Sequence, residues 1–258
     1  MTGAGNSMQI TERKQWREGE RFFRQEELIF RVCDVLGRVR PAALVVMMGS
    51  IGGYDYDARG LTYETLYALR QVFLISRMSF RLHSYPTAGE VITLSSWENG
   101  VRGAHMQRNY EFFRRDGSLF LSGKSDWILV DPVDRKILRP SAFTGKPLGP
   151  ALADVDCPDC RKILPPREKL TEAAVRKVRF TDLDHNGHLY SGRYPDIVWD
   201  ELPEDLQRGT LRDFQINYSK EATLGEELTL LACREGQTYE MEGLCGLERC
   251  FTCRCEFV

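Results

Sequence analysis

Side chains that could carry out acid–base chemistry are concentrated in one stretch of this 258-residue chain, Asp184-His185-Asn186-Gly187-His188. Two of the chain's 4 histidines lie here. A carboxylate, an amide and an imidazole can orient a water molecule, accept its proton and donate to a carbonyl oxygen. A helix is predicted from about Tyr190, and the free N–H groups at its start would favour a developing oxyanion. We therefore predict that this stretch, the 184–188 loop, is the catalytic loop of a hydrolase, with Glu221 as its distant partner.

The same five residues also have a purely structural interpretation. Asp-x-x-Gly is a common turn, because Asp and Asn side chains hydrogen-bond to the backbone near them. We expect His185 to be a plain loop residue that points away from the site. The presence of Glu221, and the absence of such polar residues from the other half of the chain, favour the functional interpretation.

The elements that must position these residues follow a pattern that starts twice. In the first half, strands are predicted at 26–36, 72–82 and 91–97, and residues 106–113 and 119–130 form a hairpin around a turn at 115–118. A buried helix is predicted from Pro41 to about Met48, ended by glycines in 49–56, and a second helix at 62–70. Residues 138–177 hold several prolines and no clear periodicity, as a linker would. In the second half, strands are predicted near 178 and at 211–218, 227–234, 239–247 and 249–258.

This restart is an internal repeat. Adding 136 to the residue numbers places Thr87-Ala88-Gly89-Glu90 on Thr223-Leu224-Gly225-Glu226, and Gly100 on Gly236. Further upstream an offset of about 150 places residues 34–38 on the 184–188 loop. The repeated unit is a helix laid on a curved antiparallel sheet, which is an α+β arrangement. We expect an internal pseudo-dimer of residues 1–139 and 177–258, joined by a linker at 140–176, with a site between the two halves.

The polar residues occur in only one of the two copies. Arg38 occupies the position of His188, and Tyr85 occupies the position of Glu221. The first half therefore keeps the scaffold without the chemistry. This asymmetry predicts that the first half binds and the second half catalyses.

The ordered set of motifs resembles the acyl-acyl carrier protein (acyl-ACP) thioesterases, plant and bacterial enzymes built as two hotdog domains. The family's loop, Asp-x-Asn-x-His-Val-Asn-Asn followed by Tyr, is matched by Asp184, Asn186, His188 and Tyr194. Its later strand, Tyr-x-x-Glu-Cys, is matched by Tyr218-Ser219-Lys220-Glu221. The first half adds the matches Leu74-Ile75-Ser76-Arg77, Tyr85-Pro86 with Gly89-Glu90, Ser95-Ser96-Trp97 and Ser125-Asp126-Trp127. The resemblance covers roughly residues 22–139 and 177–258.

The sequence departs from the family pattern at three places. Ala222 replaces the cysteine after the glutamate, so a cysteine nucleophile at that position is excluded. Tyr190-Ser191 replace the family's paired asparagines. Pro195 lies in the family's central helix, where its ring and missing N–H should kink or restart the helix.

The resemblance implies two tandem hotdog domains and hydrolysis of fatty acyl-ACP thioesters, which releases free fatty acid and ends fatty acid synthesis. No metal or organic cofactor is implied. The acyl chain would lie in the first domain, and Asp184, Asn186, His188 and Glu221 would be catalytic. Three alternatives remain open: an acyl-coenzyme A thioesterase, a non-catalytic hotdog protein that binds acyl thioesters, and a hotdog hydratase.

Thioester chemistry suggests a role for each polar residue. A thiolate with a pKa near ~8.5 leaves easily, so the reaction mainly needs an activated water and donors for the carbonyl oxygen. We expect Glu221 and His188 to form the base system and Asp184 and Asn186 to orient it. Direct attack by the Asp184 carboxylate is the alternative. Tyr194 is expected to form part of the substrate-binding wall.

A run of basic residues leads into the 184–188 loop. Between 161 and 179 there are seven basic and two acidic side chains. Acyl carrier proteins are acidic, so Arg176 and Lys177 are candidates for carrier binding. The alternative is an ordinary solvated linker.

The 8 cysteines allow two interpretations. Cys157-Pro-Asp-Cys160 and Cys250-Phe-Thr-Cys253 both have zinc-ligand spacing. However, Cys253 and Cys255 alternate with charged residues in the last strand, as small core residues do. We favour the core interpretation and expect no metal site.

Composition excludes several classes of function. A net charge of −2 gives no general attraction to nucleic acid or to anionic membranes. No apolar run approaches the ~18–20 residues that span a bilayer. Residues 1–20 lack the apolar core of a secretory signal, so we expect a cytoplasmic protein with reduced cysteines. The sequence leaves the oligomeric state open, with a homodimer as one option.

Overall fold

The computed structural model describes residues 14–145 and 153–258. In this part of the chain, 12 strands form one antiparallel sheet. Along the sheet the order is β1-β2-β4-β5-β6-β3-β9-β12-β11-β10-β8, and the short β7 pairs with β6. The predicted lack of a secretory signal concerns residues 1–20, most of which lie outside the described residues, as do the linker prolines Pro147 and Pro150.

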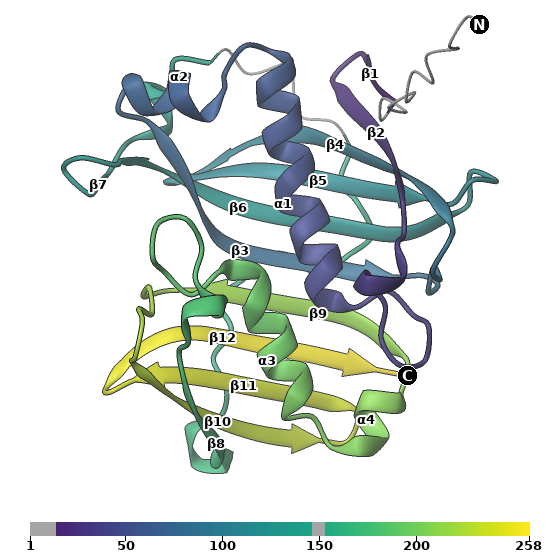
Figure 1. The fold of residues 1–258 in the computed structure, drawn as a ribbon, viewed down its shortest axis with the longest axis vertical. Helices are drawn as coiled ribbons and strands as arrows, with labels where there is room; N and C mark the ends of the chain where they lie inside the picture. The colour runs from purple at the N-terminus through teal and green to yellow at the C-terminus, as the bar shows by residue number, and fades with distance from the viewer. Residues whose placement is uncertain (1–13, 146–152) are drawn as a thin grey trace, which may run out of the picture.

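The two halves contain the elements shown in Figure 1. The first half holds β1 (Gln15–Glu18), β2 (Arg21–Glu27), α1 (Pro41–Ala58), α2 (Tyr63–Ala68), β3 (Val72–Leu82), β4 (Val91–Arg102), β5 (His105–Phe113), β6 (Leu119–Asp131) and β7 (Lys136–Ile137). The second half holds β8 (Thr171–Lys177), α3 (Tyr194–Asp200), α4 (Glu204–Arg208), β9 (Leu211–Tyr218), β10 (Glu227–Glu235), β11 (Thr238–Cys245) and β12 (Glu248–Phe257). None of the described helices is long and apolar enough to cross a membrane.

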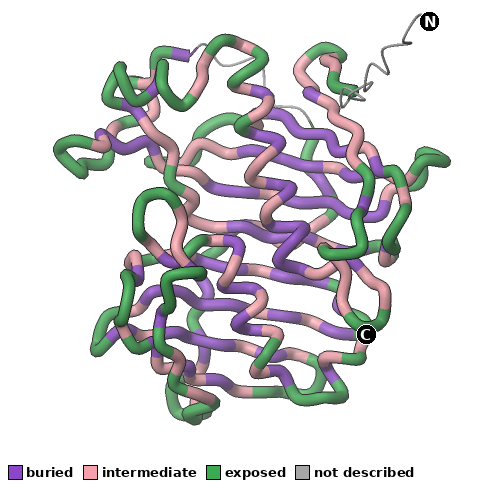
Figure 2. The backbone as a smooth tube through the Cα atoms, viewed as in Figure 1, coloured by how far each residue is buried: buried purple, intermediate pink, exposed green. Residues whose placement is uncertain are grey.

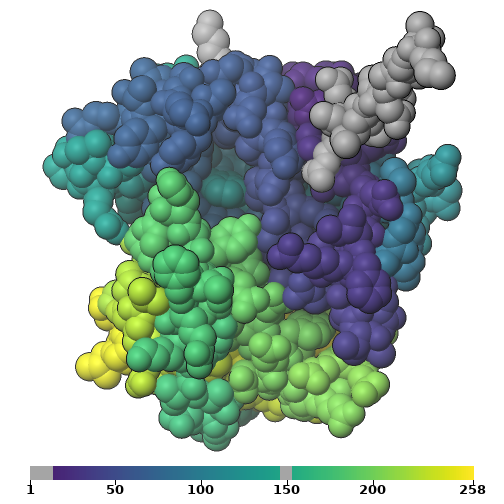
Figure 3. Space-filling view, viewed as in Figure 1, coloured from purple at the N-terminus to yellow at the C-terminus, as the bar shows by residue number. Residues whose placement is uncertain are grey.

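The halves join through one pair of strands. β3 and β9 run antiparallel, with register from Arg77 opposite Asn217 to Arg81 opposite Asp213. Outward from this pair, the order is β6, β5, β4, β2 on one side and β12, β11, β10, β8 on the other. The two halves therefore have corresponding strand orders about the join, and they meet along a continuous boundary (Figure 3).

The main helices cover the same face of the sheet. α1 lies across the strands of the first half and α3 across those of the second (Figure 1). At the contact between them, Arg40 Nη1 donates to Asp196 Oδ1 at 2.8 Å. Buried residues concentrate on the strands and the inner sides of these helices (Figure 2). The apolar core therefore runs through both halves beneath the helices.

Part of the linker crosses the opposite face of the sheet at the join. Gln215 Nε2 donates to the carbonyl of Asp159 at 3.1 Å, and Asn217 Nδ2 donates to the carbonyl of Arg161 at 3.1 Å. Ile163 N–H donates back to Asn217 Oδ1 at 2.7 Å. These bonds satisfy polar groups on the outer side of β9 and fix the linker there.

The repeat found in the sequence is present at the level of individual hydrogen bonds. Leu28 N–H donates to the carbonyl of Glu90, and Val178 N–H donates to the carbonyl of Glu226, each at 2.9 Å. In both turns the glutamate side chain accepts from the N–H of the threonine three residues earlier, at 2.7 Å for Thr87 and 2.6 Å for Thr223. The two halves thus share local hydrogen bonding as well as strand order.

Most predicted strands, and the hairpin of β5 and β6, match the observed elements. One strand prediction was wrong: of residues 26–36, only the end of β2 is strand. Phe30 lies in a short 3-10 turn and is 89% exposed. The predicted linker interval also contains β8, which pairs with β10. α3 begins at Tyr194 with Pro195 in its first turn, as the expected restart of the helix requires.

The predicted end of the first helix was also wrong. α1 does not end at Gly49; it continues through Gly49, Gly52 and Gly53 to Ala58. Glycine disfavours a helix by about 1 kcal/mol, but this preference is weak compared with packing. The side chain of Arg108 packs directly over Gly52, 3.4 Å from where a Cβ would lie. Tertiary contacts therefore sustain the helix that local sequence disfavours.

Candidate active site

The 184–188 loop is held together by its first residue. Asp184 Oδ1 accepts hydrogen bonds from the backbone N–H groups of Asn186, at 2.8 Å, and His188, at 3.2 Å. Asp184 N–H donates to the carbonyl of His188 at 2.8 Å, and Gly187 supplies a φ of 80°. His185 and Asn186 are exposed, whereas His188 is partly buried. The loop thus presents His188 inward from a tightly bonded turn.

The equivalent loop of the first half has the same backbone structure. Asp34 Oδ1 accepts from the N–H groups of Leu36 and Arg38, each at 2.9 Å, and Gly37 has a φ of 76°. This half lacks the histidine and the glutamate, yet it retains the aspartate and its two hydrogen bonds. Shaping the loop is therefore enough to account for an aspartate at this position.

Glu221 lies beside His188, as predicted. Nε2 of His188 is 3.2 Å from Oε2 of Glu221, and the side chains are 24% and 37% exposed. Backbone pairing of His188 with Thr223 brings the loop against the turn after β9. An imidazole and a carboxylate at this separation can share a proton and can together accept one from a bound water.

Arg135 is a third member of this cluster that the sequence did not reveal. Its Nη2 donates to Oε2 of Glu221 at 2.5 Å. Arg135 lies in the turn between β6 and β7, in the first half of the chain. No local pattern distinguishes it from other surface arginines, so only the folded structure identifies it.

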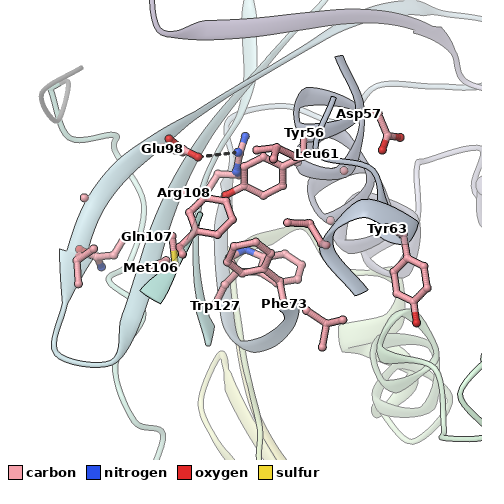
Figure 4. A pocket seen from close by; sticks show the side chains of 18 residues that line it. Tyr56, Asp57, Leu61, Tyr63, Phe73, Glu98, Met106, Gln107, Arg108 and Trp127 are labelled. Carbon is pink, nitrogen blue, oxygen red and sulfur yellow. Dashed lines mark ion pairs between the residues drawn. The ribbon is translucent and has the colours of Figure 1, made fainter. Parts of the chain in front are cut away.

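A groove leads from these polar groups into the first half. It is lined by Tyr63, Tyr67, Val72, Phe73, Leu74, Ile128, Val130, Asp131, Pro132, Arg135, Ile137, Asn186, His188 and Glu221. Tyr63, Val72 and Phe73 also line a second, mostly apolar cavity of about 370 Å³ (Figure 4). The groove and the cavity therefore share a wall, and His188 and Glu221 line the groove.

The cavity lies against α1 and the strands of the first half. Gly49 and Gly53 line it, and a Cβ added to either would meet no heavy atom within 4 Å. Tyr56, Phe73 and Trp127 form apolar walls (Figure 4). The glycines of α1 thus leave space that larger side chains would fill.

One part of the cavity wall is charged. Arg108, which is only 4% exposed, donates to Asp55 Oδ2 at 2.9 Å and to Ser96 Oγ at 2.6 Å. Glu98 lies 3.9 Å from Arg108 (Figure 4). Burial raises the pKa of the neighbouring Tyr56 hydroxyl to about 12, so it remains protonated at neutral pH. These groups are paired with one another, which offsets the cost of burying them beside an apolar space.

The residues predicted to bind substrate have other environments. Tyr194 is 3% exposed and packs in the core against Tyr218 and Phe251, with ring centroids 5.6 and 5.0 Å away. It is not among the residues that line the groove. Arg176 Nη2 donates to the buried carboxylate of Asp182 at 2.9 Å. Tyr194 and Arg176 therefore have structural contacts, and the prediction that they bind substrate gains no support from them.

The cysteines of the last strand follow the core interpretation. Cys250, Cys253 and Cys255 are buried in the apolar core. Burial raises the pKa of the Cys157 and Cys160 thiols to about 12. Across the described residues, no group of three or more His, Cys, Asp or Glu side chains is arranged to hold a metal ion.

Comparison with known families gives a consistent match. The model of the acyl-ACP thioesterase N-terminal domain matches residues 19–141, and that of the C-terminal domain matches residues 167–247. A dodecanoyl-[acyl-carrier-protein] hydrolase from Cinnamomum camphora, described as chloroplastic, is 23% identical over 83% of this chain and 57% of its own length. A palmitoyl-acyl carrier protein thioesterase from Arabidopsis thaliana is 23% identical over 64% of this chain and 42% of its own length. The chain thus matches only about half the length of these relatives.

Solved structures show the same fold. A structure described as an acyl-ACP thioesterase from Bacteroides thetaiotaomicron has a TM-score of 0.79 and 23% identity, covering 93% of this chain and 98% of that one. A 12:0-ACP thioesterase from Umbellularia californica has a TM-score of 0.76 and 17% identity, covering 94% of this chain and 99% of that one.

Proposed function

Because this chain belongs to the acyl-ACP thioesterase family, we propose that it hydrolyses fatty acyl thioesters on acyl carrier protein and releases free fatty acid, ending chain synthesis. The observation that carries the proposal is the pair His188–Glu221, 3.2 Å apart, in a groove that shares a wall with an apolar cavity. A fatty acyl chain needs an apolar space of this kind, and its thioester needs an acid–base pair at the entrance.

The architecture we propose is two tandem hotdog domains that form an internal pseudo-dimer. Corresponding strand orders about the β3–β9 pair and the repeated turns support it. We assign the first domain to residues up to 139, with the acyl-binding role. Pairing of β8 with β10 supports a second, catalytic domain that starts at Thr171, earlier than the predicted boundary at 177. Assembly of two chains into a homodimer stays a prediction.

The proposed reaction uses water as the nucleophile. Water adds to the thioester carbonyl carbon while the pair His188–Glu221 accepts one of its protons. The side-chain amide Nδ2 of Asn186, which lines the same groove, would donate to the carbonyl oxygen as negative charge develops there. The C–S bond then breaks, the carrier thiolate leaves, and the proton returns to it. No group outside the described chain and water is required for this sequence of steps.

The test of the function is hydrolysis of carrier-bound substrates by the purified chain. We expect free fatty acid and free carrier thiol in equal amounts from a series of saturated acyl-ACPs. Acyl-coenzyme A thioesters of the same chain lengths form the matched comparison. Faster turnover of the coenzyme A series would establish the acyl-CoA alternative, and binding of both series without turnover would establish a non-catalytic acyl-binding protein.

The role of Asp184 yields a prediction. In Asp184→Asn the amide oxygen can still accept the two loop hydrogen bonds, so we expect kcat within about tenfold of the unmodified chain. Asp184→Ala removes these bonds, which are worth about 1 kcal/mol each, so we expect a lower Tm and a lower kcat. A nucleophilic Asp184 would instead make Asp184→Asn as inactive as Asp184→Ala, because both changes remove the carboxylate. Asp34→Ala, in the loop without catalytic groups, is the control for loss of loop structure alone.

The cavity yields a prediction about chain length. A side chain at Gly49 would enter open space, so we expect Gly49→Ala to stabilise α1 by about 1 kcal/mol. Gly49→Leu should fill part of the cavity and lower kcat/KM for the longest accepted chain about tenfold or more, while shorter chains are hydrolysed normally. Fatty acid profiles from the acyl-ACP series measure the shift. An equal loss for every chain length would show that the acyl group lies elsewhere.

Carrier binding yields a third prediction, centred on Lys177. Lys177 is exposed, and it lies beside Gly225 in the turn that follows Glu221. Lys177→Glu should raise KM for acyl-ACP several-fold and leave KM for a small acyl thioester unchanged, because only the carrier is acidic. Arg176 is unsuitable for this test because it pairs with the buried Asp182. Lys162→Glu, on the linker segment across the other face of the sheet, is the matched control, and equal effects of the two changes would contradict docking at Lys177.

A further inference from the structure

The turn between β6 and β7 has an unusual backbone. Arg135 at its end has a φ of 52°, and Arg70, before β3, has a φ of 57°. These are the only two non-glycine residues with positive φ in residues 14–145 and 153–258. Left-handed backbone is unfavourable for L-residues with a Cβ, and glycine would adopt it without strain. An arginine at such a position is therefore kept there by its side chain or its surroundings.

The two arginines belong to one small structure. Asp131 Oδ1 accepts from the backbone N–H groups of Val133, at 2.9 Å, and Asp134, at 3.1 Å. Arg70 Nη2 lies 2.9 Å from Asp131 Oδ2 and 2.9 Å from Asp134 Oδ2. Asp131 therefore holds the turn through two of its backbone N–H groups, and Arg70 holds it through the carboxylates of Asp131 and Asp134. These contacts fix the position of the Arg135 backbone.

From this fixed position, Arg135 reaches the other half of the molecule. Its Nη2 contacts Oε2 of Glu221 at 2.5 Å, and the same oxygen lies 3.2 Å from Nε2 of His188. The side chain of Arg135 is 70% exposed. An exposed ion pair contributes little to stability, so the stability of the fold does not explain an arginine held in a left-handed turn. The contact of Arg135 with Glu221, beside His188, is the feature that remains to be explained.

We propose that Arg135 is a positioning residue, supplied by the first half, that holds Glu221 with Oε2 facing His188. This inference rests on the proposed hydrolase function. Glu221 follows the end of β9 and its side chain is 37% exposed, so without a second contact its carboxylate could rotate toward solvent. Arg135 restricts that rotation and keeps the imidazole and the carboxylate in contact before substrate arrives. The catalytic pair of the second half is thus completed by a residue of the first.

The test compares three variants with the unmodified chain on acyl-ACP. Arg135→Gly suits the positive φ, so we expect an unchanged or higher Tm. We expect kcat to fall about 10- to 100-fold, as for a misplaced catalytic group, with KM nearly unchanged. Arg135→Lys should retain an intermediate kcat. Millimolar guanidinium should restore part of the kcat of Arg135→Gly, because the position is exposed. Lys136→Ala, which removes a neighbouring exposed cation, is the control and should behave like the unmodified chain.

The outcomes separate this inference from the function itself. If the unmodified chain hydrolyses acyl-ACP but Arg135→Gly keeps its kcat, the positioning role is wrong and the function stands. A raised KM with normal kcat would also overturn it, because Arg135 would then act in substrate binding. An equal loss in Lys136→Ala would show a general charge effect instead. Absence of turnover by the unmodified chain would overturn both proposals.

Discussion

The pairing of β3 with β9 is the interaction on which the rest of the structure depends. It joins the sheets of both halves through backbone hydrogen bonds from Arg77–Asn217 to Arg81–Asp213. On the helix side, Phe80 stacks on Phe214 with ring centroids 5.1 Å apart. On the other side, Arg81 Nε donates to the buried carboxylate of Asp213 at 2.7 Å. Because a register shift of one residue would exchange these faces, apolar stacking and the ion pair both fix the alignment. The groove, with walls from both halves, exists only in this register.

The shared scaffold makes the difference between the halves informative. At the position of His188, Arg38 donates to the backbone carbonyls of Gln207, at 3.0 Å, and Gly209, at 2.7 Å. At the position of Glu221, the hydroxyl of Tyr85 accepts from the N–H of Leu211 at 2.9 Å. These residues therefore bind the second half and occupy the place where the first half would have a groove. The same loop holds the domains together in one copy and presents acid–base groups in the other.

How far the sequence could predict this structure depends on the range of the forces involved. Strands such as β9 were predictable because alternation and turn residues act locally. The contact of His188 with Glu221 was predictable because the repeat showed that both residues occur in only one of two copies of the same scaffold. The length of α1 was not predictable, because Gly49, Gly52 and Gly53 disfavour a helix locally and only packing in three dimensions compensates. The environment of Tyr194 was not predictable either, because an aromatic ring suits a core and a cavity wall equally.

Arg135 shows where such reasoning reaches its limit. Its residue type suits the surface, and its neighbours suggest an ordinary turn. The repeat points to its partner Glu221, because Tyr85 occupies the equivalent position in the first half, but it does not point to Arg135 itself. Its relation to Glu221 is created by the β3–β9 register, which sets the β6–β7 turn of one half opposite the end of β9 in the other. A sequence repeat can reveal residues added to one copy, because the other copy serves as a reference. A contact made between copies, such as that of Arg135 with Glu221, has no such reference, so it must be sought in the folded chain.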